Sequence, residues 1–406
     1  MTRATTTAIG ILILFIFSTC LYSQSWNIQT TGVYDYLWSA SFPKPDTGYA
    51  VGSNGTIIKT VNGGVNWQSQ SNPSGVLLHH VYFISGSLGW AVGHSGRIIK
   101  TTNGGQNWVL QSSGTSSNLF YVYFIHRNYG WVVGDNGVLK TTDGGDTWAT
   151  SLVEPWVYSV YFVNQNTGWA GVRYGKLFKT TNGGDNWIAQ TSGTVSTSFS
   201  MYFINENTGW AAGDYNSVIK TTNGGSTWFH QDYEFGSFST TFRSVVFAND
   251  QMGWMAGLDG LVLRTTNGGT NWVQQSVPVN GDYLSIRVNG VQGWAVGENG
   301  TVIHSDNVTN LNTISSSVPE RYNLSQNYPN PFNPSTKISF DIPKSGFTSL
   351  KIYDILGKNI ATLLSSELQE GTYEYEFDAS ALNSGIYYYV LNSGSFTETR
   401  KMMLVK

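Results

Sequence analysis

The chain has 406 residues, with 22 Lys plus Arg against 25 Asp plus Glu, for a formal net charge of −3. This balance excludes the basic field with which proteins attract nucleic acid, so no nucleic-acid partner is expected. Cys20 is the single cysteine, which excludes a disulfide framework, and the six histidines show no metal-ligand spacing. We therefore expect neither a metal nor any other cofactor.

The first 23 residues have the layout of a secretory signal peptide. Arg3 is followed by the apolar run Ile11 to Phe17 and by small residues before Gln24. The run is too short to span a membrane. Cleavage after Ser23 therefore leaves a mature chain with no transmembrane segment and no cysteine.

One unit of about 40 residues is copied along most of the chain. Each copy carries Gly followed by Trp or Tyr and then small residues, at Gly48, Gly89, Gly130, Gly168, Gly209, Gly253 and Gly293. Six copies continue with Thr-x-(Asn/Asp)-Gly-Gly-x-(Asn/Thr)-Trp, which we call the box, at Thr60–Trp67, Thr101–Trp108, Thr141–Trp148, Thr180–Trp187, Thr221–Trp228 and Thr265–Trp272. The repeat predicts an all-β propeller, with tryptophans that serve mainly to pack its blades.

A seventh box is missing after Gly293, and its counterpart stands at the other end of the chain. Ser25 to Gly32 resembles the stretch that follows the other box tryptophans, such as Asn186 to Gly193. An N-terminal strand that completes the last blade would remove the open edge of a linear array. We therefore predict a seven-bladed β-propeller over residues 24–306, closed by this strand.

Blade two shows the four strands of a unit most clearly. Its innermost strand is predicted at Val81 to Ile84, followed by Gly89 to Gly93, Arg97 to Thr102 and Trp108 to Gln111. Two-residue turns such as Asn54-Gly55 are predicted between the second and third strands, because Asn and Gly tolerate the positive φ of a tight hairpin.

A candidate binding face follows from this topology. The starts of the innermost strands and the turns between strands two and three lie on one face, and the box turns lie on the opposite one. The residue four positions before the recurrent inner-strand Phe is aromatic in most blades, and in blade seven the count starts from Arg287. Together these residues form a ring that borders the channel mouth. The candidate binding residues on this face are Trp38, His79, Trp156, Tyr158, Arg173, Tyr174, Asp214, Tyr215, Arg243 and Tyr283. They suit a glycan or protein ligand, and packing between blades accounts for the same residues as a purely structural alternative.

Catalysis is the alternative function. A glycoside hydrolase would need two carboxylates across one bond, and this face offers Asp135, Asp214, Asp259 and Glu298. Nothing in the sequence distinguishes a pair among them. No catalytic residue is therefore assigned, and a binding or scaffold module is the preferred prediction.

Beyond Asp306 the composition changes. A polar stretch predicts a linker at 307–326, and alternating runs such as Lys337 to Ile342 and Ile386 to Leu391 predict a small Ig-like β-sandwich at 327–406.

Two family resemblances accompany these patterns. The box Thr141 to Trp148 resembles the Asp box of BNR and sialidase-type propellers, and the combined repeat most resembles the seven-bladed propellers of the photosystem II assembly factor family over about residues 25 to 306. In that family the boxes are turns remote from the binding face, so the resemblance implies the fold and leaves the ligand open.

The C-terminal unit resembles the type A sorting domain of the type IX secretion system. Its marks are the opening Tyr328 to Pro334, the run Leu350 to Lys358, Ser384 to Tyr388 and the basic end Arg400 to Lys406. The resemblance implies the type IX machinery as a partner and export through the periplasm to the outer cell surface or the medium. Removal of the domain would follow export, and the mature protein is expected to be a monomer.

Overall fold

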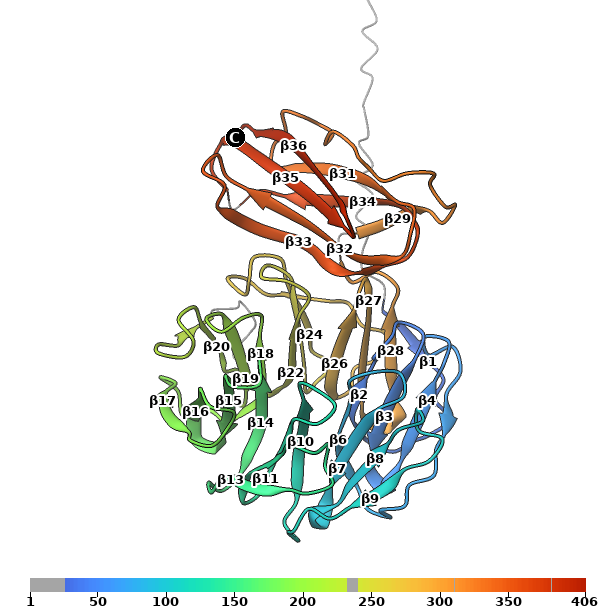
Figure 1. Ribbon diagram of the computed structural model, residues 1–406, viewed down its shortest axis with the longest axis vertical. Helices are drawn as coiled ribbons and strands as arrows, with labels where there is room; N and C mark the ends of the chain where they lie inside the picture. Colours follow the sequence, from blue (N-terminus) through green and yellow to red (C-terminus); the bar gives the residue numbers. More distant parts are fainter. Residues whose placement is uncertain (1–25, 232–239, 310, 381) are drawn as a thin grey trace, which may run out of the picture.

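The computed structural model describes residues 26–231, 240–309, 311–380 and 382–406, and the predicted signal peptide lies outside them. The described residues form nine four-stranded antiparallel sheets, seven of which are the blades of a propeller. Figure 1 shows the propeller with a second domain, orange to red, beside its last blades. No helix in the described part of the chain is long and apolar enough to cross a membrane.

The first four blades each use four consecutive strands, given from the channel outward. Blade one consists of β2 (Leu37–Ser41), β3 (Gly48–Gly52), β4 (Ile57–Thr60) and β5 (Gln68–Ser69). Blade two consists of β6 (Leu78–Phe83), β7 (Gly89–Gly93), β8 (Ile98–Thr101) and β9 (Val109–Gln111). Blade three consists of β10 (Leu119–Phe124), β11 (Gly130–Gly134), β12 (Gly137–Thr141) and β13 (Ala149–Leu152). Blade four consists of β14 (Val157–Phe162), β15 (Gly168–Val172), β16 (Lys176–Thr180) and β17 (Ile188–Thr191).

The last blade is completed from the other end of the chain. Blade five consists of β18 (Ser198–Phe203), β19 (Gly209–Gly213), β20 (Val218–Thr221) and β21 (Phe229–His230). Blade six consists of β22 (Phe242–Phe247), β23 (Gly253–Gly257), β24 (Val262–Thr265) and β25 (Val273–Gln274). Blade seven consists of β26 (Tyr283–Asn289), β27 (Gln292–Gly297), β28 (Val302–Ser305) and the N-terminal β1 (Asn27–Gln29). Because β1 pairs antiparallel with β28, Ile28 opposite Ile303, the predicted closure of the ring is confirmed.

The Gly-Trp motif has a separate physical reason for each residue. A Cβ on Gly89 would lie 2.6 Å from the ring of Phe83, so only glycine leaves room for the inner-strand phenyl group. Trp90 in turn stacks on Phe124 of the next blade, with ring centroids 3.5 Å apart. The motif therefore packs the blades against each other, as predicted from its recurrence.

The box turns join neighbouring blades by hydrogen bonds. In blade two, the Thr101 hydroxyl donates to Asn103 Oδ1 at 3.0 Å and accepts from the backbone N–H of Gly105 at 2.9 Å. A carbonyl of the next box, that of Gly144, accepts from Trp90 Nε1 at 3.0 Å. Since each box shapes its own turn and holds the preceding blade, its repetition serves the fold.

The turns between the second and third strands are longer than predicted. Four of them are one-turn 3₁₀ segments of three residues: η1 (Ser53–Gly55), η2 (His94–Gly96), η3 (Arg173–Gly175) and η4 (Glu298–Gly300). Blade three has a two-residue turn, because Gly134 pairs with Gly137. In blade one the last two residues of this three-residue turn, Asn54 (φ 53°) and Gly55 (φ 77°), both have a left-handed backbone.

The C-terminal domain packs two further sheets face to face. One has the order β29 (Leu311–Ser315), β34 (Gly371–Asp378), β31 (Ser335–Ile342) and β30 (Asn323–Leu324). The other has the order β33 (Asn359–Leu368), β32 (Gly346–Tyr353), β35 (Gly385–Ser393) and β36 (Phe396–Leu404). The sandwich matches the predicted strand content, and its Ig-like character stays a prediction.

The segment 307–326, predicted as a linker, contains β29 and β30 of this sandwich. Leu311 and Leu324 are buried in its core, 2% and 0% exposed, although polar residues surround them in the sequence. The polar composition concealed these two anchoring side chains, so the connection between the domains is shorter than predicted.

Candidate functional site

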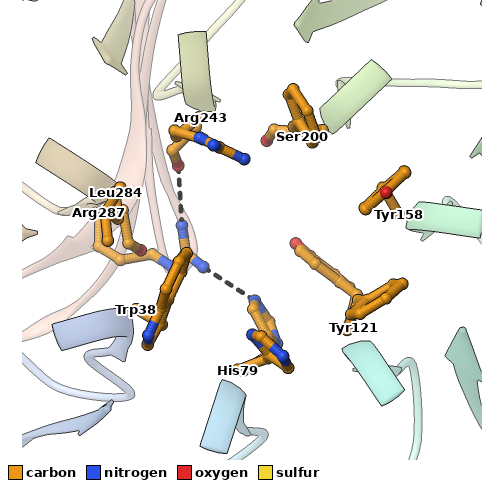
Figure 2. A pocket seen from close by; sticks show the side chains of 13 residues that line it. Trp38, His79, Tyr121, Tyr158, Ser200, Arg243, Leu284 and Arg287 are labelled. Atoms are coloured by element: carbon orange, nitrogen blue, oxygen red, sulfur yellow. Dashed lines mark hydrogen bonds between the residues drawn. The ribbon is translucent and has the colours of Figure 1, made fainter. Parts of the chain in front are cut away.

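The starts of the innermost strands surround a cavity of about 150 Å³ at the channel mouth (Figure 2). Its lining consists of Trp38, His79, His80, Phe120, Tyr121, Tyr158, Phe199, Ser200, Arg243, Ser244, Leu284, Ser285 and Arg287. Four of the predicted site residues are among them: Trp38, His79, Tyr158 and Arg243. They come from four different blades, so only the closed ring brings them together.

An almost continuous belt of rings borders this cavity. Its contacts run from Trp38 to His79 (5.5 Å between centroids), His79 to Phe120 (5.4 Å), Phe120 to Tyr158 (5.0 Å) and Tyr158 to Phe199 (5.1 Å). The belt ends at Arg243, whose guanidinium lies 4.3 Å from the Phe199 centroid. Flat rings at a mouth suit stacking on sugar faces, peptide planes or aromatic side chains.

Tyr283 does not reach the mouth, and its predicted place is wrong by one residue. It pairs with Gly297, is 0% exposed, and donates its hydroxyl to the carbonyl of Val279 at 2.9 Å. Leu284 occupies the position of the other ring residues. The error arose because Val288 stands where the other blades have Phe, which shifted the count onto Arg287.

Arg287 is a cavity residue that the sequence analysis did not select. It donates from Nη1 to the carbonyl of Ile286 at 2.8 Å, and its Nη2 lies 3.2 Å from His80 Nε2. Burial, followed by the charge of Arg287, holds the pKa of His80 well below its usual value. His80 is therefore neutral, and Arg287 carries the positive charge of the channel wall.

A second belt of tyrosines lies deeper in the channel and was also missed. Tyr82, Tyr123, Tyr161 and Tyr202 follow one another with ring centroids 5.0 to 5.2 Å apart. The signal was present, since each stands directly before the inner-strand Phe of its blade.

Two polar atoms at the mouth lack a hydrogen-bond partner within the described residues: His79 Nε2 and Arg243 Nε are both buried. Burial, aided by His94, lowers the pKa of His79 to about 4, so this ring is neutral at neutral pH. No ion pair of Arg243 or Arg287 is found among the described side chains. The cavity therefore presents two guanidinium groups whose charge a ligand can neutralise.

The other predicted residues form a rim on blades four and five, outside the cavity. The guanidinium of Arg173 lies between two rings, 4.5 Å from the Trp156 centroid and 4.7 Å from that of Tyr174. Trp156, Tyr174 and Tyr215 are 40%, 64% and 71% exposed. All three have a left-handed backbone, with φ of 55°, 61° and 51°. At Tyr174 and Tyr215 this conformation belongs to the turn between the second and third strands, whose second residue is also left-handed at Asn54, Ser95 and Asn299.

Tyr158 connects the rim with the cavity electrostatically. Burial raises its pKa, and Arg173 from the rim and Arg243 from the cavity both act to lower it. The charges of the rim and of the cavity therefore both act on Tyr158.

Three of the four carboxylates predicted on this face have hydrogen-bond partners. Asp135 Oδ2 accepts from the N–H of Asn118 at 3.0 Å, and Asp214 Oδ1 accepts from that of Thr197 at 2.6 Å. Glu298 Oε2 accepts from the Tyr36 hydroxyl at 3.4 Å, while Asp259, at φ 58°, shapes its own turn. Within the described ranges, no three His, Cys, Asp or Glu side chains gather as a metal site would need.

Fold and site together define the class: a seven-bladed, Asp-box β-propeller with an aromatic channel mouth, joined to a C-terminal β-sandwich. Residues 19–113, 190–281 and 236–316, together more than half of the chain, match the family described as photosynthesis system II assembly factor YCF48. The chain belongs to this family. Residues 326–406 match the family described as secretion system C-terminal sorting domain. This domain marks the protein for type IX export to the outer membrane or cell surface, and makes the secretion machinery a partner.

Solved structures agree with the fold. The chain is similar to a structure described as YCF48 bound to D1 peptide, with 20% identity, a TM-score of 0.58 and coverage of 69% of this chain and 96% of that one. YCF48 from Cyanidioschyzon merolae gives 20% identity, a TM-score of 0.58 and coverage of 69% and 98%. A structure described as U3-55K gives 12% identity, a TM-score of 0.59 and coverage of 69% and 98%. These identities show the fold alone, and no match was found among curated proteins.

Proposed function

We propose that the exported propeller is a binding module that holds an extended, carboxylate-bearing ligand across its channel mouth. The single observation that carries this proposal is the combination of an aromatic belt with two guanidinium groups that have no ion-pair partner among the described residues. Stacking would hold the body of the ligand and the guanidiniums its acidic groups. An acidic peptide and a uronic-acid glycan both supply this chemistry.

The rim extends the argument from one cavity to an elongated site. A cavity of about 150 Å³ admits a single residue or sugar ring rather than a whole ligand. The exposed rings of Trp156 and Tyr174, fixed around Arg173, provide the continuation of the contact surface. A solved relative described as bound to a peptide supports the peptide form of the ligand.

The test is binding of the mature propeller to an array of acidic peptides and to a glycan array that includes uronic acids. For the ligand found, Trp156→Ala, Tyr174→Ala and Arg243→Gln should each weaken affinity about fivefold or more, as expected for anchor residues. Asp146→Ala is the control, because Asp146 lies on the box face and contacts Lys100 at 3.5 Å. Equal loss from both faces would contradict the assignment.

The glycoside hydrolase alternative has no supporting observation beyond the presence of carboxylates. No Asp or Glu lines the described cavity, and the carboxylates of Asp135, Asp214 and Glu298 accept hydrogen bonds from neighbouring groups. The same glycan panel tests hydrolysis directly, because release of new reducing ends would establish an enzyme. Binding without release supports the module.

A further inference from the structure

Six of the seven junctions between blades are built alike. The aromatic residue of each second strand donates to a carbonyl of the next blade's box: Tyr49 to Gly104, Trp90 to Gly144, Trp131 to Gly183, Trp169 to Gly224, Trp210 to Gly268 and Trp294 to Gly63, at 3.0 to 3.2 Å. The same rings stack on the inner-strand Phe of that next blade at 3.4 to 3.9 Å. Each of these six junctions thus contains this hydrogen bond and this stacked pair.

The junction between blades six and seven has neither. Blade seven lacks a box, so Trp254 Nε1 is buried without a hydrogen-bond partner among the described residues. Val288 stands at the register position of the stacking Phe, opposite Gly293, and the side chain of Val308 lies against Gly293 where the other blades have the phenyl ring. Trp254 is nevertheless 0% exposed, so something else covers it.

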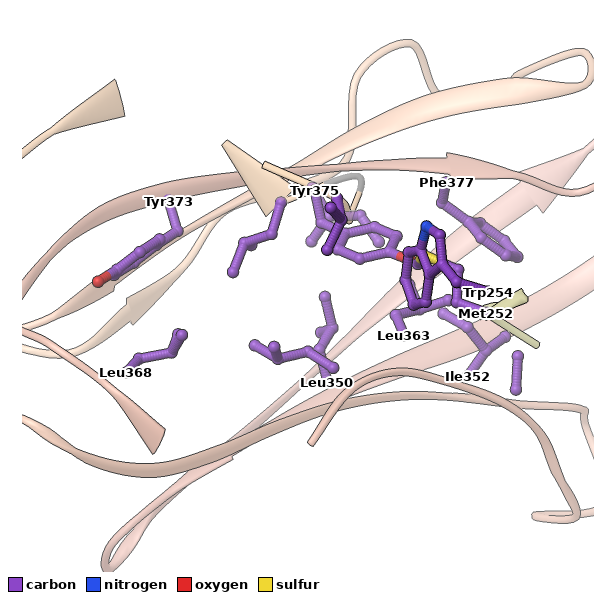
Figure 3. Packing of buried hydrophobic residues seen from close by; sticks show 14 of the residues in the cluster. Met252, Trp254, Leu350, Ile352, Leu363, Leu368, Tyr373, Tyr375 and Phe377 are labelled. Atoms are coloured by element: carbon purple, nitrogen blue, oxygen red, sulfur yellow. The ribbon is translucent and has the colours of Figure 1, made fainter. Parts of the chain in front are cut away.

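The C-terminal domain covers this junction. Met252 and Trp254 of blade six belong to one apolar cluster with Leu363 of β33 and Tyr375 and Phe377 of β34 (Figure 3). Among the clusters of described residues, this is the one that contains side chains of both domains. Side chains of the sandwich, together with Trp26 and Val308, therefore pack in one cluster with Trp254 at the junction that lacks a box.

Polar contacts fix the position of the sandwich on the same blade. Asn249 donates from Nδ2 to the carbonyl of Leu363 at 3.1 Å, and Asp250 Oδ1 accepts from the N–H of Thr362 at 3.2 Å. Both propeller residues belong to the turn between β22 and β23, on the box face. In blade five the equivalent Asn205 makes the same turn bonds, to the N–H groups of Asn207 and Thr208. The bonds from Asn249 and Asp250 to the second domain are thus additional to the turn bonds that blades five and six share.

We propose that the C-terminal domain, besides directing export, replaces the missing seventh box. It acts as an intramolecular clasp that covers Trp254 and holds blades six and seven together. Its removal from the propeller uncovers Met252 and Trp254 and leaves this junction the weakest of the ring.

Hydrogen–deuterium exchange of the full chain tests the clasp strand by strand. Leu363→Asp places a charge against Met252 and Trp254, and should raise exchange in β23 and β27 about tenfold while β7 and β11 stay unchanged. Leu368→Asp is the matched control, because Leu368 lies on the same strand, is equally buried at 5% exposed, and stands far from Trp254 in Figure 3. In a Leu368→Asp protein whose sandwich stays folded, as exchange in β31 and β35 reports, β23 and β27 should exchange as in the wild type.

Asn249→Ala and Asn205→Ala form a second matched pair. Both remove the same turn bonds, so any additional rise in β23 and β27 for Asn249→Ala measures the contact with Leu363. If Leu363→Asp unfolds the sandwich altogether, the clasp is lost as well and the same rise is expected. Unchanged exchange in β23 and β27, or an equal rise in all seven blades, would overturn the proposal.

Discussion

Closure of the ring by the N-terminal segment allows a quantitative prediction at one residue. Trp26 precedes β1, is 4% exposed, and lies against Gly293, where an added Cβ would come within 3.0 Å of its ring. A buried tryptophan hides roughly 150–250 Å², worth about 4–6 kcal/mol at ~25 cal/mol per Å², which is an upper estimate for a real unfolded chain. Trp26→Ala should therefore lower the free energy of unfolding by about 3–5 kcal/mol.

The assay is urea unfolding followed by tryptophan fluorescence. All 15 tryptophans lie between residues 26 and 294, so the signal follows the propeller and not the C-terminal domain. Ile28→Ala is the control on the same segment, because Ile28 is 60% exposed and its loss should change stability by no more than about 0.5 kcal/mol. Trp272→Ala, in a blade with its own box, should cost as much as Trp26→Ala, since both residues are 4% exposed. A cost for Trp26→Ala as small as that for Ile28→Ala would refute closure through this segment.

Two further predictions concern pH and processing. The pKa of His79 is about 4 in the folded protein against an ordinary 6.5, so the neutral ring stabilises the fold above pH 6.5 and this contribution, about 3 kcal/mol, is lost as the pH falls towards 4. His79→Phe places at this position the residue found at Phe120 and Phe199. It should reduce the decrease in the free energy of unfolding between pH 6.5 and 4, and an equal decrease in the variant and the wild type would contradict the assignment. In a host with the type IX machinery, the intact mass of the exported protein should lack residues 1–23 and the C-terminal domain, and full-length protein retained inside the cell would contradict this.

The propeller could be predicted from the sequence because its repeated motifs have local physical causes. Gly89 leaves space for Phe83 within its own blade, and Trp90 stacks on Phe124 in the next. Each requirement recurs with the repeat, so every copy confirms the others. The N-terminal strand was found in the same way, from its likeness to the segments that follow box tryptophans.

The candidate site could be predicted only in part, because it depends on differences between the copies. Blade seven lost the Phe that fixed the register, and Tyr283 was placed where Leu284 lies. Arg287 lines the channel at a position where the other blades mostly have tyrosine, so its role emerges only once the strands are paired. The contact of Leu363 with Asn249 in blade six joins residues more than a hundred positions apart, and no local sequence pattern predicts it.

The missing box and the position of the second domain share one cause. In six blades the box connects the third strand to the outermost strand, as between β8 and β9. In blade seven the outermost strand is β1, which comes from the other end of the chain, so no such connection forms after Ser305. The chain instead leaves the ring at this point, held by the bond from the N–H of Val308 to the carbonyl of Val291 at 2.6 Å. Closing a propeller with an N-terminal strand therefore removes a box at the place from which any appended domain departs. That domain begins beside the junction between blades six and seven, which lacks a box, and apolar residues of the domain pack against this junction.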